Sequence, residues 1–388
     1  MHSRHATESI LRREDPGRVV YAPNYWQWFS HQQRHGLLPE QLASCNDQLD
    51  MLNELGVDVF SRNIYCDQRR CWFGGLSSED NSDFECETVE LEQVNGDLHI
   101  ERTYHLPSGS LTERLRHVFR ESTLVQEKFL IDDYDEQLTL LEEFVERRRW
   151  TFNPDLWRQW TDRTGDRGII CAGELFSPLK LLHLVMGPEN TTFLLVDEPE
   201  RARAILQAHE DAQLDLVRQM ALAGVPSMMA MDNLDTVFHT PQYVEDYCAS
   251  FYQNASAICH AHGSTFFIHA CGNQKENLGR ISSYGVDGLE GVAYPPLGNI
   301  ELDQAFKASG DRFIITGGIS AMETRDLQSR QAVFDYVGEL FERLRPYRHR
   351  FFLAASCNTA INASWDTLLH FRDAWKELGC PGHAGQSD

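Results

Sequence analysis

Eight short apolar segments recur along this 388-residue chain, separated by segments with helical periodicity. They are residues 19–22, 58–61, 168–171, 227–231, 265–269, 288–292, 312–316 and 350–355. Strands that are apolar at every position, rather than at every second one, are typical of a parallel sheet covered by helices. Eight strand–helix units favour a closed (β/α)8 TIM barrel, an α/β fold. An open doubly wound sheet would carry a glycine-rich phosphate loop after its first strand, and residues 21–25 contain no glycine.

The segment 240–269 shows one such unit clearly. Thr240 and Pro241 are typical of an N-cap and of the first helical position, and Gly263 is typical of a helix end. Apolar residues between them recur on one helical face, and the apolar run 265–269 follows at once. The pattern predicts a helix that ends directly before a buried strand.

Residues 84–111 break this pattern. Polar and apolar residues alternate in 85–94 and in 98–104, with Asn95-Gly96 between the two runs. Asn-Gly flanked by alternating runs is a strong signal for a β-hairpin. We therefore expect one barrel domain over residues 1–388, with an N-terminal arm at 1–16 and an antiparallel hairpin within an insertion at 77–125.

The charge balance limits the partners. The chain has 35 basic and 58 acidic side chains, for a formal net charge of -23. Nucleic acids and anionic membranes both need a basic surface, so neither is an expected partner.

No apolar run approaches the roughly 18 residues of a membrane span, and the first residues lack the apolar core of a secretory signal. Ten cysteines are too sparse for a disulfide scaffold, which favours a reducing cytoplasm.

Metal-ligand residue types follow or lie within three of the predicted strands. His269 and Cys271 end one strand, Glu290 lies in the next, and Cys357 follows the last. The carboxyl ends of barrel strands converge on one mouth, where active sites are built. Thiolate, imidazole and carboxylate are the ligands that Zn²⁺ takes. Taken singly, each cysteine is more often a packing residue, and Glu290 would equally suit an ion pair with a basic residue.

Several segments resemble the uroporphyrinogen decarboxylase-like superfamily. The similar segments are 266–273, 285–289 and 315–320, with further likeness at 12–20 and 104–111. The arginine-rich substrate signature of the porphyrinogen decarboxylases is missing after the first strand. The chain is more similar to the zinc-dependent corrinoid-linked methyltransferases, which include methylcobamide:coenzyme M methyltransferases and O-demethylase types.

The resemblance implies a metal site and a reaction. His269, Cys271 and Cys357 occupy the motif positions that hold zinc in those methyltransferases, and Glu290 would be a fourth, displaceable ligand, as in cobalamin-independent methionine synthase. The implied reaction moves a methyl group between a small methylated substrate, with a methoxylated compound favoured, and a corrinoid (cobalamin) on a partner protein. A metal-independent decarboxylase-like lyase and a non-catalytic corrinoid- or tetrapyrrole-binding protein remain as alternatives.

Polar residues after the strand at 227–231 are candidate catalytic groups. Asp232, Asn233 and Asp235 could orient a substrate or supply a proton to the leaving group. They would equally serve to cap the following loop and helix.

Candidate substrate-binding residues lie in the first loops and after a late strand. Asn24, Tyr25, Trp26 and Tyr65 belong to aromatic-rich loops that would suit a planar ligand, although core packing also explains such residues. The pair Gly317–Gly318 would allow a close backbone approach or a tight turn.

Overall fold

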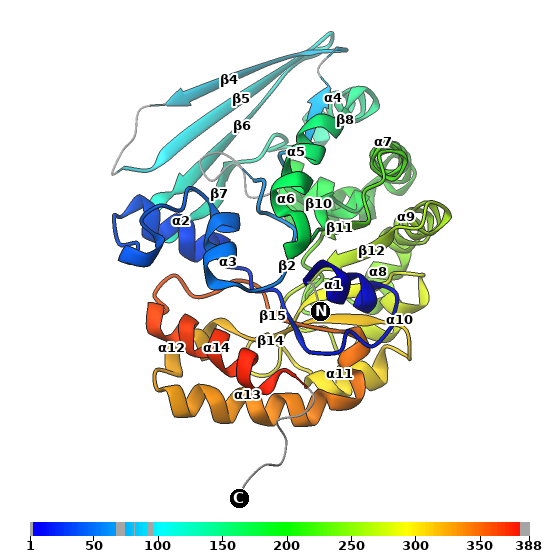
Figure 1. Cartoon of the computed structure of the whole chain (residues 1–388). Helices are drawn as coiled ribbons and strands as arrows, with labels where there is room; N and C mark the ends of the chain where they lie inside the picture. The colour runs from blue at the N-terminus through cyan, green and yellow to red at the C-terminus, as the bar shows by residue number, and fades with distance from the viewer. Residues whose placement is uncertain (1–2, 67–73, 81, 92–95, 381–388) are drawn as a thin grey trace, which may run out of the picture.

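The computed structural model describes residues 3–66, 74–80, 82–91 and 96–380, and parallel strands form its centre (Figure 1). Within the described residues, a seven-stranded sheet has the order β1-β15-β14-β13-β12-β11-β10, and β2 pairs with β9. These strands are β1 (Val20–Tyr21), β2 (Val59–Ser61), β9 (Gly168–Ile170), β10 (Ala172–Leu175), β11 (Ser227–Met231), β12 (Thr265–His269), β13 (Gly288–Val292), β14 (Ile314–Ile319) and β15 (Phe351–Ala355).

Backbone hydrogen bonds join the seven-stranded sheet to the β2–β9 pair. The amide of Asp58 donates to the carbonyl of Tyr21 over 2.9 Å, which places β2 beside β1. The amide of Cys171 donates to the carbonyl of Ser61 over 2.9 Å, and only Cys171 separates β9 from β10. Residues 168–175 therefore act as one bent strand, and the described part of the chain contains all eight predicted strands. The predicted (β/α)8 barrel is confirmed.

Helices surround the strands (Figure 1). They are α2 (Trp26–Arg34), α3 (Gln48–Leu55), α5 (Pro154–Thr164), α6 (Pro178–Asp197), α7 (Pro199–Leu222), α8 (Pro241–Tyr247), α9 (Ala249–Ala261), α10 (Leu278–Ser283), α11 (Leu302–Ala308), α12 (Ala321–Asp326), α13 (Arg330–Leu344) and α14 (Trp365–Leu378). Thr240 caps α8 as predicted, although the helix expected after it is divided at Cys248 into α8 and α9. Among the described residues, no helix is long and apolar enough to cross a membrane.

The first helix, α1 (Ser3–Leu11), closes the amino-terminal end of the barrel. Its Ala6 and Ile10 are fully buried and belong to the same apolar cluster as the inward-facing Phe60, Phe267 and Phe352. The Phe60 and Phe352 rings stack with centroids 4.4 Å apart. Because this end is filled by side chains, any chemistry in the barrel belongs at the carboxyl ends of the strands.

The predicted hairpin is present as part of a larger sheet. Strands β4 (Glu85–Leu91) and β5 (Leu98–Leu106) pair antiparallel, while Asn95 of the expected turn lies outside the described residues. The described sheet continues with β6 (Gly109–Val118) and β7 (Thr123–Lys128), and β3 (Ser77–Asp80) pairs with β8 (Arg149–Phe152).

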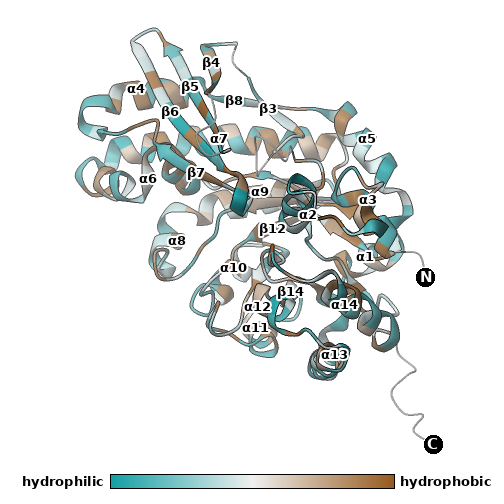
Figure 2. Ribbon diagram, turned by 90° about the vertical axis from the view of Figure 1, so that its left-hand side faces the viewer, coloured by the Kyte–Doolittle hydropathy of each residue, from teal (hydrophilic) through white to brown (hydrophobic). Residues whose placement is uncertain are grey.

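The inserted sheet packs on α4 (Tyr134–Arg147), where the Tyr104 and Phe144 rings are 5.0 Å apart. Figure 2 shows the sheet standing out from the barrel, with its β7 end near α2. There the side chain of Gln27 donates to the carbonyl of Glu121, in η2 (Phe119–Glu121), over 3.3 Å. The domain limits 1–388, 77–125 and 1–16 stay a prediction.

One charged contact near the closed end of the barrel makes stability depend on pH. Asp287 accepts from Arg13 and, over 2.8 Å, from the ring of His260, and its pKa is lowered because these partners outweigh its burial. The hydrogen bond that His260 donates to Asp287 raises the pKa of His260. A raised histidine pKa contributes stability fully below the unfolded value of about 6.5, and this contribution is lost as pH rises through the folded value.

Replacing His260 by Ala is therefore expected to cost more stability near pH 5.5 than near pH 9. Because this side chain is half exposed, solvent screening keeps the difference below about 1 kcal/mol. Urea unfolding at the two pH values measures it. His262→Ala is the matched control, since within the described residues the hydrogen bond of its ring is to the backbone carbonyl of Ile258 and not to a carboxylate. Equal losses at both pH values for His260→Ala would contradict the expected linkage.

Candidate metal centre at the barrel mouth

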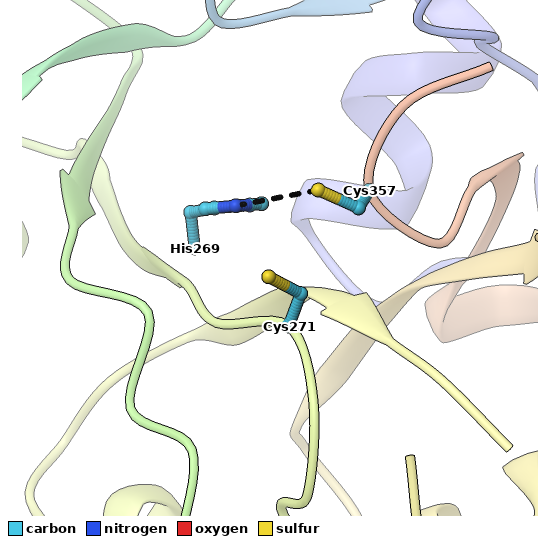
Figure 3. A group of neighbouring side chains, drawn as sticks. All are labelled: His269, Cys271 and Cys357. Atoms are coloured by element: carbon cyan, nitrogen blue, oxygen red, sulfur yellow. Dashed lines mark hydrogen bonds between the residues drawn. The ribbon is translucent and has the colours of Figure 1, made fainter. Parts of the chain in front are cut away.

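Three predicted ligands meet at the carboxyl end of the barrel. His269 is the last residue of β12, Cys271 lies two residues further on, and Cys357 lies two residues after β15. One ligand atom from each lies within 4.8 Å of the others, and His269 Nε2 is 4.0 Å from Cys357 Sγ (Figure 3). Residues 88 positions apart in the sequence thus converge as the barrel topology predicts.

The loops that carry the two thiols are held by polar side chains. A carboxylate oxygen of Asp235 accepts from the amide of Asn273 over 3.1 Å, beyond Cys271. Between them Gly272 has φ +85°, and a Cβ there would lie 2.0 Å from the same carboxylate oxygen, so glycine is required. On the other side, the side-chain amide of Asn24 donates to the backbone carbonyl of Cys357 over 3.2 Å.

The two thiols and the imidazole influence one another's protonation. Hydrogen bonding from Cys357 and the neighbouring His269 ring lower the pKa of Cys271, while contact with Cys271 and burial raise the pKa of Cys357. The thiol of Cys271 therefore ionises more readily than that of Cys357. A thiolate is the form of cysteine that binds metals.

Glu290 lies behind His269 and not among the three grouped ligands. Its carboxylate contacts Nδ1 of His269, on the side of the ring away from the Nε2 atom that points to Cys357. It also accepts from Nε of Arg62 over 3.0 Å, with both side chains over 90% buried. Burial alone would lower the pKa of His269, but the Glu290 charge outweighs it and raises that pKa. The fourth-ligand role of Glu290 stays a prediction.

Arg62 is a residue that the sequence analysis missed. It directly follows β2, so it stands at the same mouth as the other strand-end residues. A glutamate that is buried within an apolar strand needs a cation beside it. The position of Glu290 in such a strand was therefore the signal in the sequence for a basic partner. The sequence contains 35 lysines and arginines, and their spacing along the chain does not indicate which of them faces Glu290.

The three-residue group fits a zinc ion. Its donors are two sulfur atoms and one imidazole nitrogen, which is a donor set that zinc takes, and they lie within 4.8 Å of one another. A carboxylate on the other ring nitrogen fixes the tautomer of a histidine ligand. Three protein ligands leave one position for substrate, which is typical of catalytic rather than structural zinc.

The three candidate catalytic residues have different surroundings. Asn233 has φ +53° and places its amide oxygen 3.2 Å from Cys271 Sγ, beside the metal group. Asp232 is buried and accepts from the amide of Ser177 over 2.9 Å and from the hydroxyl of Tyr252 over 2.5 Å. Its burial raises its pKa despite these partners. Asp235 holds the Cys271 loop, and it also accepts from the amide of Val237 over 2.8 Å in the loop that follows it. The catalytic roles of these three residues stay a prediction.

Most of the candidate substrate-binding residues are packed within the protein. Tyr25 is 1% exposed and shares a 2.7 Å hydrogen bond with the hydroxyl of Tyr21, and Trp26 is equally buried. The hydroxyl of Tyr65 accepts from the amide of Gly173 over 2.6 Å. Their part in substrate binding stays a prediction.

Gly317 and Gly318 each lie where a larger side chain would collide with a neighbouring element. A Cβ on Gly317 would lie 2.9 Å from the carbonyl of Val292, and one on Gly318 would lie 3.2 Å from Leu340 of α13. Gly317 therefore allows a close approach near the mouth, beside Ser356, whereas Gly318 allows the strand to pack against the helical layer.

An open cavity of about 540 Å³ lies beside the loop that follows Cys357. It lies between α2, the η2 corner of the inserted sheet, α12 and the loop after Cys357. Its lining residues are Gln27, His31, Arg120, Glu121, Ala321, Asn358, Thr359, Ala360 and Ile361. Asn358, the residue after Cys357, lines this cavity, and its side-chain nitrogen lies 3.7 Å from Cys357 Sγ.

Comparisons with known proteins agree with this architecture. The chain is similar to a methyltransferase from Methanosarcina mazei, with a TM-score of 0.62, 14% identity, and coverage of 97% of this chain and 99% of that one. It also matches a D-psicose 3-epimerase from Clostridium cellulolyticum H10 with a TM-score of 0.36, 10% identity, and coverage of 58% and 83%. No curated protein sequence matches the chain. The model of the uroporphyrinogen decarboxylase (URO-D) family matches residues 139–378, more than half of the chain, and the chain therefore belongs to that family.

Proposed function

We propose that this protein is a zinc-dependent methyltransferase that moves a methyl group from a small methoxylated compound to a corrinoid on a partner protein. The observation that carries the proposal is the meeting of His269, Cys271 and Cys357 at the barrel mouth. A metal-independent lyase has no use for two thiols and an imidazole in one group. The structural likeness to a methyltransferase over nearly the whole chain gives further support at the level of the fold.

When bound, zinc would supply a Lewis acid that stabilises the negative charge on the departing oxygen. The chain's own residues prepare this position. His269 and the two cysteines fix three donors, and Glu290 and Arg62 hold the imidazole in place.

The methyl group must face the incoming corrinoid in line, so the substrate must be held rigidly. Asn233 is placed to orient it, because its amide oxygen lies beside Cys271. Asp232, whose pKa is raised by burial despite the hydrogen bond that it accepts from Tyr252, is the proposed holder of a proton on its carboxyl group when the substrate is bound. That proton would be available to the leaving alkoxide.

The test is methyl transfer to free cob(I)alamin, followed by absorbance. The zinc-loaded protein is assayed with methoxylated aromatics, methylamines and methyl thioethers. We expect methylcobalamin to form with at least one methoxylated aromatic, and Cys357→Ser to abolish its formation. Cys380→Ser, which alters an exposed cysteine remote in sequence from the ligands, is the matched control. Zinc-loaded protein that transfers no methyl group from any donor would reject the proposal in favour of the lyase or binding-protein alternative.

A further inference from the structure

An asparagine side chain contacts the sulfur of one of the three grouped ligands. Asn358 directly follows Cys357, and its side-chain nitrogen lies 3.7 Å from Cys357 Sγ. The nitrogen of a side-chain amide donates hydrogen bonds, whereas its oxygen only accepts them. A sulfur that binds a metal is a thiolate, so it is stabilised by a donor and repelled by an acceptor. The way in which the Asn358 amide faces therefore matters for the metal group.

A second asparagine, Asn24, is fixed in its orientation by two backbone groups. Its side-chain oxygen accepts from the backbone amide of Trp26 over 3.3 Å, and its side-chain nitrogen donates to the backbone carbonyl of Cys357 over 3.2 Å. A backbone amide only donates and a carbonyl only accepts, so exchanging the two ends of the Asn24 amide would lose both hydrogen bonds. Asn24 is 8% exposed, and buried polar groups that lose their partners are costly.

The orientation of Asn24 determines that of Asn358. The side-chain nitrogen of Asn24 also donates to Oδ1 of Asn358 over 3.1 Å, and this turns the nitrogen of Asn358 toward the sulfur of Cys357. Asn63 supports Asn24 from the other side, since its side-chain nitrogen donates to Oδ1 of Asn24 over 3.2 Å. The oxygen of Asn63 in turn accepts from the hydroxyl of Ser61 over 3.2 Å. We call Asn63, Asn24 and Asn358 the asparagine network.

The barrel topology brings the asparagine network together. Asn24 lies three residues after β1, Asn63 two residues after β2, and Asn358 three residues after β15. Strand β1 pairs with β15, and the backbone hydrogen bond between Asp58 and Tyr21 places β2 beside β1. Three neighbouring strands thus deliver these side chains to the same mouth that holds the metal group.

We propose that the asparagine network positions Cys357 as a metal ligand: Asn24 holds the amide of Asn358 so that it donates an N–H group to the Cys357 sulfur. This inference rests on the metal site of the proposed function and adds residues that act through Cys357. Groups that hydrogen-bond to a metal ligand fix its direction and tune its charge, and their loss typically costs about 10–100-fold in metal affinity. Cys357 would thus be supported as His269 is supported by Glu290.

Cobalt(II) bound in place of zinc gives a spectroscopic test, because its thiolate-to-cobalt charge-transfer band reports the electron density on the ligand sulfur. We expect Asn358→Leu, which keeps the size of the side chain and removes the donor, to shift this band of the full-length protein to longer wavelength. A sulfur that accepts no hydrogen bond gives up an electron more easily. The zinc affinity of the same variant, measured by competition with a chelator, should fall about tenfold or more.

A second variant tests whether Asn24 acts through Asn358. Asn24→Leu should shift the band in the same direction, and the double variant should shift it no further than Asn358→Leu alone. Asn254→Leu is the matched control, since Asn254 lies on α9 and its side chain donates to Glu210 over 2.8 Å. Its band should stay in place. The melting temperature of each metal-free variant shows whether the fold is retained, and Asn358, which lines an open cavity, is the more tolerant position.

The outcomes separate this inference from the metal site on which it rests. Wild-type protein that binds neither cobalt nor zinc would reject the metal site and the positioning role together. A metal-loaded Asn358→Leu variant with an unchanged band and unchanged zinc affinity would overturn the inference and leave the metal site intact. A double variant whose band shifts further than that of Asn358→Leu would show that Asn24 acts independently of Asn358, which also contradicts the inference.

Discussion

Replacing Cys357 by Ser is expected to remove zinc from the protein. The wild type should bind about one zinc ion per chain, and the variant should bind it at least about 100-fold more weakly, because a serine hydroxyl does not ionise to replace a thiolate donor. Cys271→Ser should behave in the same way, since its sulfur belongs to the same group and has the lowered pKa. Elemental analysis of the purified proteins and competition with a chelator measure both effects.

The control for this experiment is a cysteine outside the metal group. Cys380 is exposed, and Cys380→Ser should keep the full zinc content. Methyl transfer should fall with zinc content in the Cys357 and Cys271 variants and remain unchanged in the Cys380 variant. Wild-type protein that binds no zinc, or a Cys357→Ser variant that binds it with unchanged affinity, would refute a shared site.

The sequence was sufficient to predict the barrel fold and the grouping of His269, Cys271 and Cys357 at its mouth. Barrel strands are apolar throughout, so they are visible as short runs, and parallel topology brings their carboxyl ends together regardless of separation in sequence. For this reason His269 and Cys357 could be placed at one mouth from strand ends alone. The hairpin was visible for a similar reason, because alternation and an Asn-Gly turn are local signals.

Residues that act through long-range charge contacts could not be predicted in this way. Arg62 follows an ordinary strand, and many other basic residues also lie at the ends of strands and helices. Their partners are set by which strands become neighbours and by which direction each side chain takes. The aromatic residues Tyr25 and Trp26, which the sequence suggested as part of a ligand wall, are both buried, and their part in substrate binding stays a prediction.

The buried pair of Arg62 and Glu290 gives the largest expected effect on stability. Replacing Arg62 by Met would leave the Glu290 carboxylate buried beside His269 without its cation. Removing one partner of a buried ion pair costs about 3–5 kcal/mol, because the remaining charge is uncompensated. We expect a loss of about 3 kcal/mol in the free energy of unfolding, measured by urea denaturation of chelator-treated protein so that bound metal does not contribute.

Two further variants separate this cause from a general effect of losing an arginine. Arg330→Met breaks an exposed pair with Glu377 and should cost less than about 1 kcal/mol. The double variant Arg62→Met with Glu290→Met removes both charges and should recover at least half of the loss, because two apolar side chains of similar size leave no buried charge unpaired.

The three possible outcomes have different meanings. If Arg62→Met lowers the free energy of unfolding no more than Arg330→Met does, the ion pair of Arg62 and Glu290 does not hold Glu290 in place. If the double variant is as unstable as the single one, lost packing rather than charge explains the effect. If both expectations hold, Arg62 is the residue that allows an apolar strand to carry a carboxylate against the imidazole of the metal group.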